Sequence, residues 1–269
     1  MKITVLVDNN TIIDNYYQGE PAVCYYIEDN GTNILFDVGY TDLFIKNAKA
    51  LNINLADIST IVLSHGHNDH TRGLKYLINN GSLHDAKLIA HPDVFYPRIE
   101  NGIEIGSPLS EKKVAKVIDL DLRSTPVQVS TNILFLGEIP SSCEFERRKA
   151  FGLISKGDGE HEDYIMDDSA IVYKGNNGLF IITGCSHSGI CNIIEYAKTV
   201  CNDNRIAGVI GGFHLFDVSE RLKHTIEYFI ENDIKELYPC HCVSFMAKAE
   251  IHKHIPIHEV GVGLTIEIA

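Results

Sequence analysis

The chain has 269 residues, 45% of them hydrophobic and 22% charged, which is enough apolar material for a core and excludes a disordered protein. Its 36 acidic and 23 basic side chains give a formal net charge of −13, so no nucleic-acid partner is expected, because binding to phosphate backbones needs clustered Lys and Arg. The seven cysteines have no regular spacing, the first residues do not form a signal peptide, and no apolar window approaches the ~20 residues of a membrane helix. We therefore expect a soluble cytoplasmic protein with reduced thiols and no membrane partner; its oligomeric state is not predicted.

Short β-branched runs of strand length recur in both halves of the chain, and most end at Gly, Asn, Asp or Pro. They cover residues 3–7, 23–27, 33–36, 60–63, 87–90, 133–136, 170–173, 179–183, 207–210 and 264–268. The Gly-Asn-Asn-Gly segment at 175–178 joins two of these runs and predicts a hairpin.

Helical patterns fall between the strand runs. Apolar stripes predict helices over 190–201 and 222–230, a looser one over 42–51, and a short one after Ser110 that reaches Val117. Strand clusters flanked by helices predict an α/β protein, an αββα sandwich of two mixed β-sheets between outer helices. No linker or repeat divides the chain, so we expect one domain over 1–269 with a loosely patterned insertion around 91–120 that holds one helix.

The most informative segment follows the strand at 60–63. It reads Ser-His-Gly-His-Asn-Asp-His and supplies His65, His67, Asp69 and His70 within six residues, before a helical pattern begins at Thr71. In an extended turn His65 and His67 project to the same side, and Asp69 and His70 open the helix that follows. This spacing predicts two adjacent divalent ions, one bound by His65 and His67 and one by Asp69 and His70. Imidazole and carboxylate ligands together favour Zn²⁺, with Fe²⁺ or Mn²⁺ as alternatives.

This His-x-His-x-Asp-His segment after a buried strand resembles the signature of the metallo-β-lactamase-fold superfamily, and the resemblance covers most of the chain. The Asp-x-Gly turn at Asp37 matches an early family motif, which implies that Asp37 orients a metal ligand by a hydrogen bond. More narrowly, three segments resemble the 7,8-dihydropterin-6-methyl-4-(β-D-ribofuranosyl)-aminobenzene-5′-phosphate synthase-like subgroup. They are Thr-Gly-Cys-Ser-His-Ser-Gly-Ile at 183–190, Gly-Gly-Phe-His-Leu at 211–215 and Pro-Cys-His-Cys at 239–242.

The resemblance leaves the ligand that bridges the two ions open. Other superfamily members carry an Asp near the turn after the strand at 179–183, where this chain has Cys185. The alternatives are a Cys185 thiolate, His187 with a different geometry, or the upstream Asp168. We favour His187 as a ligand, because a buried Cys more often only packs.

The later motifs complete the predicted site. His241 matches the late superfamily His that completes the second ion, and the Cys residues beside it lack the second pair that a Cys-based zinc knot would need. His214 ends the strand run at 207–210 behind two glycines, and we assign it to substrate contact or to proton transfer, against a purely structural role.

Two further residues are possible substrate contacts. His91 ends a strand and is expected at the mouth of the pocket together with Arg98, which is a candidate phosphate contact or else a solvated side chain. The other histidines, 84, 161, 224, 252, 254 and 258, have no supporting pattern and are expected at the surface.

These features predict a metal-dependent hydrolase that acts on a small phosphorylated or ester substrate through a metal-bound hydroxide at a binuclear site, with Asp69 orienting the water. A synthase-like transferase, as in the resembling subgroup, and a non-catalytic metal-binding sensor are the alternatives. Phosphate-binding loops, dinucleotide motifs and a Gly-x-Ser-x-Gly nucleophile are absent from the sequence, so those chemistries lack support.

Overall fold

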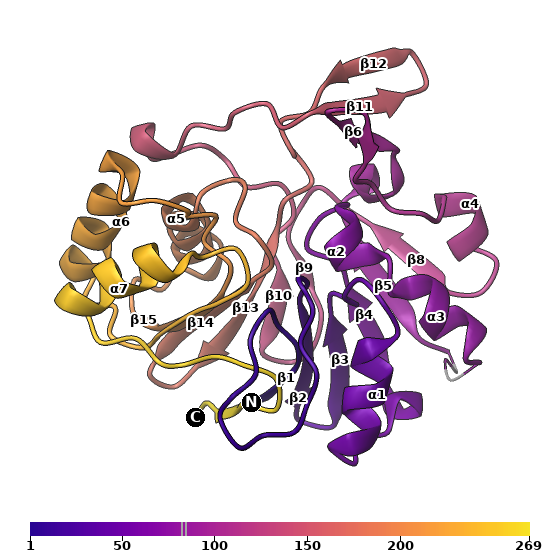
Figure 1. Ribbon diagram of the computed structural model, residues 1–269, viewed down its shortest axis with the longest axis horizontal. Coiled ribbons are helices and arrows are strands. Elements are labelled where there is room, and N and C mark those ends of the chain that lie inside the picture. The colour runs from indigo at the N-terminus through magenta and orange to yellow at the C-terminus, as the bar shows by residue number, and fades with distance from the viewer. Residues whose placement is uncertain (82, 84) are drawn as a thin grey trace.

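In the computed structural model, which describes residues 1–81, 83 and 85–269, two large sheets pack face to face and helices cover their outer faces (Figure 1). The first sheet has seven strands in the order β17 (Thr265–Glu267), β1 (Lys2–Val7), β2 (Cys24–Asp29), β3 (Thr32–Phe36), β4 (Thr60–Val62), β5 (Lys87–Ala90) and β8 (Asp119–Leu122). The second has six, β16 (Leu237–Pro239), β15 (Ile206–Gly211), β14 (Gly178–Thr183), β13 (Ala170–Gly175), β10 (Ile133–Phe135) and β9 (Val127–Gln128). The predicted αββα sandwich is confirmed.

Both sheets are mixed. The parallel strands in each sheet determine the edge at which the loops that follow them lie. Strands β3, β4, β5 and β8 run parallel in the first sheet, and β14, β15 and β16 run parallel in the second. Because the carboxyl ends of parallel strands meet at one edge, the segments after β3, β4, β14, β15 and β16 can converge there. The predicted hairpin at 175–178 joins β13 to β14 with full antiparallel pairing.

Three apolar clusters account for the layers. One lies between the sheets and contains Phe36, Val62 and Ile182 from facing strands. A second packs the six-stranded sheet against α5 (Ile190–Cys201), α6 (Glu220–Glu231) and α7 (Phe245–His254). The third packs the seven-stranded sheet against α1 (Leu43–Ala50) and α3 (Leu74–Asn79), and it includes Val114 of α4 (Glu111–Val114). The short α2 (Asn68–Thr71) begins directly after the His-x-His segment.

The segment around 91–120 holds the predicted helix after Ser110, which is α4, and it also holds strands that were not predicted. It contributes β8 to the first sheet, a 3₁₀ turn at Pro92–Phe95, and two strands, β6 (Arg98–Glu100) and β7 (Ile103–Glu104). These two join β11 (Leu153–Lys156) and β12 (Gly159–Glu162) in a third, four-stranded sheet at one end of the sandwich (Figure 1). Strand β12 is exposed along its whole length, so it lacks the apolar alternation that reveals a strand in a sequence.

Two further 3₁₀ turns, at Leu55–Asp57 and Glu144–Glu146, complete the described elements. No helix in the described part of the chain is long and apolar enough to cross a membrane.

Candidate metal centre

The loops that carry the predicted ligands meet at one edge of the two sheets. Asp37 follows β3, the 64–70 segment follows β4, the 184–189 turn follows β14, His214 comes shortly after β15, and His241 comes shortly after β16. Asp37, Ser186, His214 and His241 all have positive φ values, of 54°, 56°, 50° and 50°. Such strained backbone is concentrated at functional sites, where the surrounding structure holds it.

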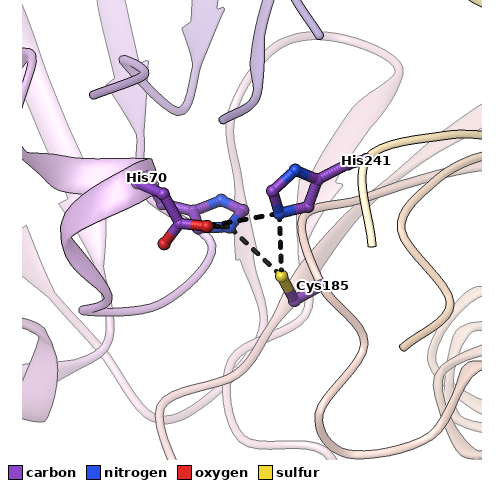
Figure 2. A group of neighbouring side chains, drawn as sticks. His70, Cys185 and His241 are labelled. Atoms are coloured by element: carbon purple, nitrogen blue, oxygen red, sulfur yellow. Dashed lines mark hydrogen bonds and ion pairs between the residues drawn. The ribbon is translucent and has the colours of Figure 1, made fainter. Parts of the chain in front are cut away.

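One group of side chains at this edge consists of Asp69, His70, Cys185 and His241, whose ligand atoms all lie within 4.8 Å of one another. Cys185 Sγ is 3.2 Å from His70 Nε2 and 3.2 Å from His241 Nε2 (Figure 2). Asp69 Oδ2 is 3.5 Å from His70 Nε2 and 3.4 Å from His241 Nε2. The thiol, the carboxylate and both imidazoles therefore face a common point.

Polar residues behind this group fix the two imidazole rings. His70 Nδ1 donates to Asp37 Oδ2 over 2.7 Å, and Asp37 also accepts from the backbone and hydroxyl of Ser64. His241 Nδ1 donates to Asn9 Oδ1 over 3.2 Å, and its backbone N–H donates to Asp8 Oδ1 over 2.9 Å. With each Nδ1 occupied, each Nε2 is left to face Cys185.

The second group consists of His65, Cys185 and His187. His67 lies against it, with its Nδ1 3.0 Å from His65 Nε2 and its ring centroid 4.9 Å from that of His187. Ser64 Oγ lies 3.0 Å from His65 Nδ1, on the other side of that ring. Cys185 belongs to both groups and so lies between them.

Burial and neighbouring carboxylates set the charge of these histidines. Burial, together with neighbouring histidines, lowers the pKa of His65 and His187 well below the usual value, and burial lowers the pKa of His67 to about 4. Burial acts in the same direction on His70, but Asp69 and Asp37 outweigh it and raise its pKa to about 9. The first three rings are thus neutral at neutral pH and present lone pairs, as metal ligands must.

The donor set fits divalent cations. Among the described residues His67 Nε2 and His187 Nε2 are buried and have no hydrogen-bond partner, and His65 Nε2 lies 3.0 Å from His67 Nδ1. A buried polar atom without a partner is costly, and a shared cation would satisfy it. Imidazole, thiolate and carboxylate are the donors that Zn²⁺ takes in proteins.

A cavity of about 480 Å³ opens over both groups. Cys185, His187 and His241 lie at it together with His67 and Asp69. Its remaining lining residues are Asn9, Pro21, Tyr40, Asn68, Glu100, Ile105, Phe151, His214, Phe216 and Cys242. Lys and Arg are absent from this lining, so a ligand in the cavity meets neutral, aromatic and acidic side chains.

The sequence is similar to a known protein family and to two archaeal proteins. Residues 17–128 match the profile of the "Metallo-beta-lactamase superfamily". The chain is 36% identical to the uncharacterized protein MJ0448 of Methanocaldococcus jannaschii over 93% of both chains. It is 31% identical to the 7,8-dihydropterin-6-methyl-4-(beta-D-ribofuranosyl)-aminobenzene-5′-phosphate synthase of the same organism, over 82% of this chain and 80% of the synthase. The chain belongs to the metallo-β-lactamase superfamily.

A solved structure of this superfamily agrees along the whole chain. Tm1679, described as a metal-dependent hydrolase of the β-lactamase superfamily, is 26% identical and superposes with a TM-score of 0.85 over 100% of this chain and 99% of its own. The resemblances inferred from the sequence, to the superfamily and to the synthase-like subgroup, are confirmed.

The three alternatives for the bridging position, Cys185, His187 and Asp168, lie in different places relative to the two groups. Cys185 is the residue common to both groups, whereas His187 lies with His65 and His67. Asp168, the third alternative, belongs to neither group; its Oδ2 accepts from the backbone N–H and the hydroxyl of Ser188. His214 lies at the cavity, with its ring centroid 4.4 Å from that of His187.

The two possible substrate contacts in the insertion were predicted wrongly. Arg98 is neither solvated nor at the mouth of the cavity over the ligands: it is 1% exposed and pairs with Asp163 and Asp167, at 2.7 Å in both cases. His91 is buried, lies outside that cavity, and its Nδ1 accepts from the N–H of Asp93 at the start of a 3₁₀ turn. The reasons differ: Arg98 lies in β6 of the third sheet and pairs with two buried carboxylates, whereas His91 caps the 3₁₀ turn that follows β5.

Several residues at the site were not predicted from the sequence. Asp8 and Asn9 follow β1, which ends at the same edge as β3, but they lack the Asp-x-Gly turn that singled out Asp37. Phe151 comes from the segment before β11 and has no local signal; its ring centroid is 5.6 Å from that of His67. Of the histidines expected at the surface, 161, 224, 252, 254 and 258 are exposed, and His84 lies outside the described residues.

Proposed function

We propose that the protein is a metal-dependent hydrolase that acts on a small phosphorylated or ester substrate at a site for two divalent ions, with zinc favoured over iron or manganese. The observation that carries this proposal is the pair of ligand groups that share Cys185 beneath one cavity. The first ion would be held by His65, His67 and His187, and the second by Asp69, His70 and His241, with Cys185 between them.

Two divalent ions bound there would lower the pKa of a water molecule and polarise the acceptor oxygen of the substrate. Asp69 has a second carboxylate oxygen with which to orient that water. Burial and the positive charge of Arg221 lower the pKa of His214 to about 4, so its ring is neutral near pH 7. His214 therefore suits a hydrogen bond to substrate better than a role as a charged acid.

The lining and the volume of the cavity indicate the charge and the size of the substrate. Because the described lining holds no Lys or Arg, an anionic group of the substrate would bind to the ions. A volume of about 480 Å³ suits a small molecule. No macromolecular partner is part of the proposal.

A synthase-like transferase is the second candidate, and the 31% identical synthase favours it. In that case the ions would hold a phosphorylated substrate for a condensation instead of a hydrolysis. The two candidates share the ligand set, so only turnover separates them. A non-catalytic metal sensor would bind the ions and show no turnover.

The first experiment is elemental analysis of the protein purified without added metal. Two equivalents of Zn, Fe or Mn are expected, and less than one equivalent would contradict a two-ion site. His67→Ala is expected to lose metal, whereas His258→Ala, which removes an exposed histidine outside the cavity lining, is expected to keep it.

The second experiment assays the loaded protein, with Zn²⁺ or Mn²⁺, on phosphodiesters, phosphomonoesters and lactones. Hydrolysis that is lost in His67→Ala and in Asp69→Asn supports the hydrolase. Silence of a fully loaded protein across the panel would contradict the hydrolase and favour the synthase or the sensor.

A further inference from the structure

The segment 163–169, which links β12 to β13, passes directly behind the loops that carry the first ligand group. Asp167 Oδ2 accepts from the backbone N–H of Gly66, between His65 and His67, over 2.7 Å. Asp168 Oδ2 accepts from the backbone N–H of Ser188, next to His187, over 2.8 Å. Two consecutive carboxylates thus each hold one of the two ligand loops.

Asp167 is itself held rigidly. Its Oδ1 accepts from Arg98 Nη2 over 2.7 Å, and Arg98 Nε donates to Asp163 over 2.7 Å. The side chains of Arg98 and Asp167 are fully buried. Gly66 leaves no room for movement on this side, because a Cβ there would lie 1.9 Å from Arg98 Nη1.

Asp168 is fully buried as well, and it holds the turn at His187 by more than one bond. Its Oδ2 accepts the Ser188 hydroxyl over 2.5 Å in addition to the Ser188 N–H. The next residue, Ser169, donates its N–H to the carbonyl of Ser64, which precedes His65. The segment therefore fixes the separation between the His65 and His67 loop and the His187 turn.

The second ligand group is supported from elsewhere. Asp8 and Asn9 hold His241, and Asp37 holds His70. None of these residues lies in the 163–169 segment. The two groups therefore have largely separate supports; the link between them is Asp37, which also bonds Ser64, whose hydroxyl lies 3.0 Å from His65 Nδ1.

We propose that Asp167 and Asp168 are positioning residues for the first ion alone, the one held by His65, His67 and His187, and that Arg98 locks Asp167 in place. The inference rests on the proposed two-ion site. Loss of residues that orient ligands typically weakens metal affinity by about 10- to 100-fold. Loss of either carboxylate should lower the affinity for the first ion by about that factor and leave the second ion bound.

The test titrates the full-length apoprotein with Zn²⁺ against a competing chelator, which gives the number of sites and their affinities without any activity assay. Wild type is expected to bind two ions. Asp167→Asn and Asp168→Asn are each expected to lower the zinc affinity of one site by about 10- to 100-fold. The zinc affinity of the other site should stay within about threefold of the wild-type value. Asp8→Asn should instead weaken the other site.

Two controls separate positioning from general loss of stability. Asp29→Asn removes a buried carboxylate that bonds Ser130 and Asn132 and has no contact with either ligand loop, so both sites should stay unchanged. The second control uses a His67→Ala background, which lacks a ligand of the first ion. There, Asp167→Asn should leave the affinity for the remaining ion unchanged, whereas Asp8→Asn should still lower it. If Asp167→Asn does not fold, Arg98→Lys, which keeps the charge but loses the paired contacts, takes its place with the same expected direction.

The outcomes are distinct. A wild-type protein that binds no ion would overturn the proposed function. A wild-type protein that binds two ions, with both sites unchanged in the Asp167 and Asp168 variants, would overturn only this inference. Equal weakening of both sites by Asp167→Asn would also overturn it, because the support would then not be specific to the first ion.

Discussion

Cys185 would make the uptake of ions by the proposed site depend on pH. Burial raises the pKa of its thiol well above the usual value, so the thiol keeps its proton when no ion is bound. A bound cation reverses this preference, because the thiolate is the ligand form. Ion binding through Cys185 therefore releases a proton, and affinity for the ion should rise with pH.

Replacement of Cys185 by Ala is expected to abolish binding of at least one ion, since both groups lose a donor. The protein loaded with Co²⁺ offers a direct measurement, because thiolate ligation gives a charge-transfer band that the variant should lack. Cys191→Ala, which removes another buried thiol outside both groups, is the control and should retain the band. An unchanged band in Cys185→Ala would remove Cys185 from the ligand set.

Position 66 has no room for a side chain. A Cβ at this position would lie 1.9 Å from Arg98 Nη1 and 2.4 Å from the Val94 carbonyl oxygen. Gly66→Ala is therefore expected to lower the free energy of unfolding by about 1–3 kcal/mol, the usual cost of overpacking, and to weaken metal binding. Gly157→Ala, where a Cβ meets nothing within 4 Å, should change neither quantity in denaturant titrations and zinc binding.

Among the elements, α5 shows how a carboxylate supports the start of a helix. Glu146 Oε2 accepts from the backbone N–H groups of Cys191 and Asn192, which are among the free donors of the first turn. Asn192 Oδ1 in turn accepts from the N–H groups of Ser142 and Cys143. These bonds fasten the segment before Phe151 to the helix, so they also support one wall of the cavity.

Glu146 gives this region a dependence on pH. Burial raises its pKa above the unfolded value of 4.5, so the folded state binds more protons than the unfolded state in that interval. Its contribution to stability is fully present below pH 4.5 and falls as the pH rises through the folded-state pKa. Glu146→Gln should therefore gain stability relative to wild type between pH 4.5 and pH 7, as measured by urea unfolding at both values. The exposed Glu144→Gln should show no such gain.

The elements also show what the sequence can predict. Apolar periodicity marked the buried strands and α5, because one face of each packs in a core. The same signal failed for α7, where Phe245 and Met246 are exposed, and for the four short strands of the third sheet. For the site, the segment from His65 to His70 was evident because its residues are adjacent in sequence. The roles of Asp167 and Arg98 arise from contacts up to 101 residues apart and leave no local pattern.

At the scale of the whole molecule, the candidate ligands come from both sheets. The 65–70 segment follows a strand of the first sheet, and Cys185, His187 and His241 follow strands of the second. Ions bound between them would therefore join the two halves of the sandwich.

Removal of the ions should destabilise the fold as a whole. A ligand at 100 times its Kd adds about 2.7 kcal/mol to the free energy of unfolding, which corresponds to about 5–10 °C in Tm for a domain of this size. Treatment with a chelator is expected to lower Tm by at least this amount in calorimetry, and re-addition of zinc should restore it. An unchanged Tm after proven metal removal would contradict a role for the ions in joining the sheets.

The uneven spacing of the ligands along the chain has a consequence for folding kinetics. His65, His67, Asp69 and His70 are neighbours even in an unfolded chain, whereas Cys185 lies 115 residues beyond His70. The unfolded polypeptide can therefore chelate zinc locally, before the second sheet has supplied its share of the donors. Free zinc during refolding would stabilise that unfolded, partly liganded state and oppose its own incorporation. The favourable order of events is to fold first and to admit the ions afterwards through the open cavity.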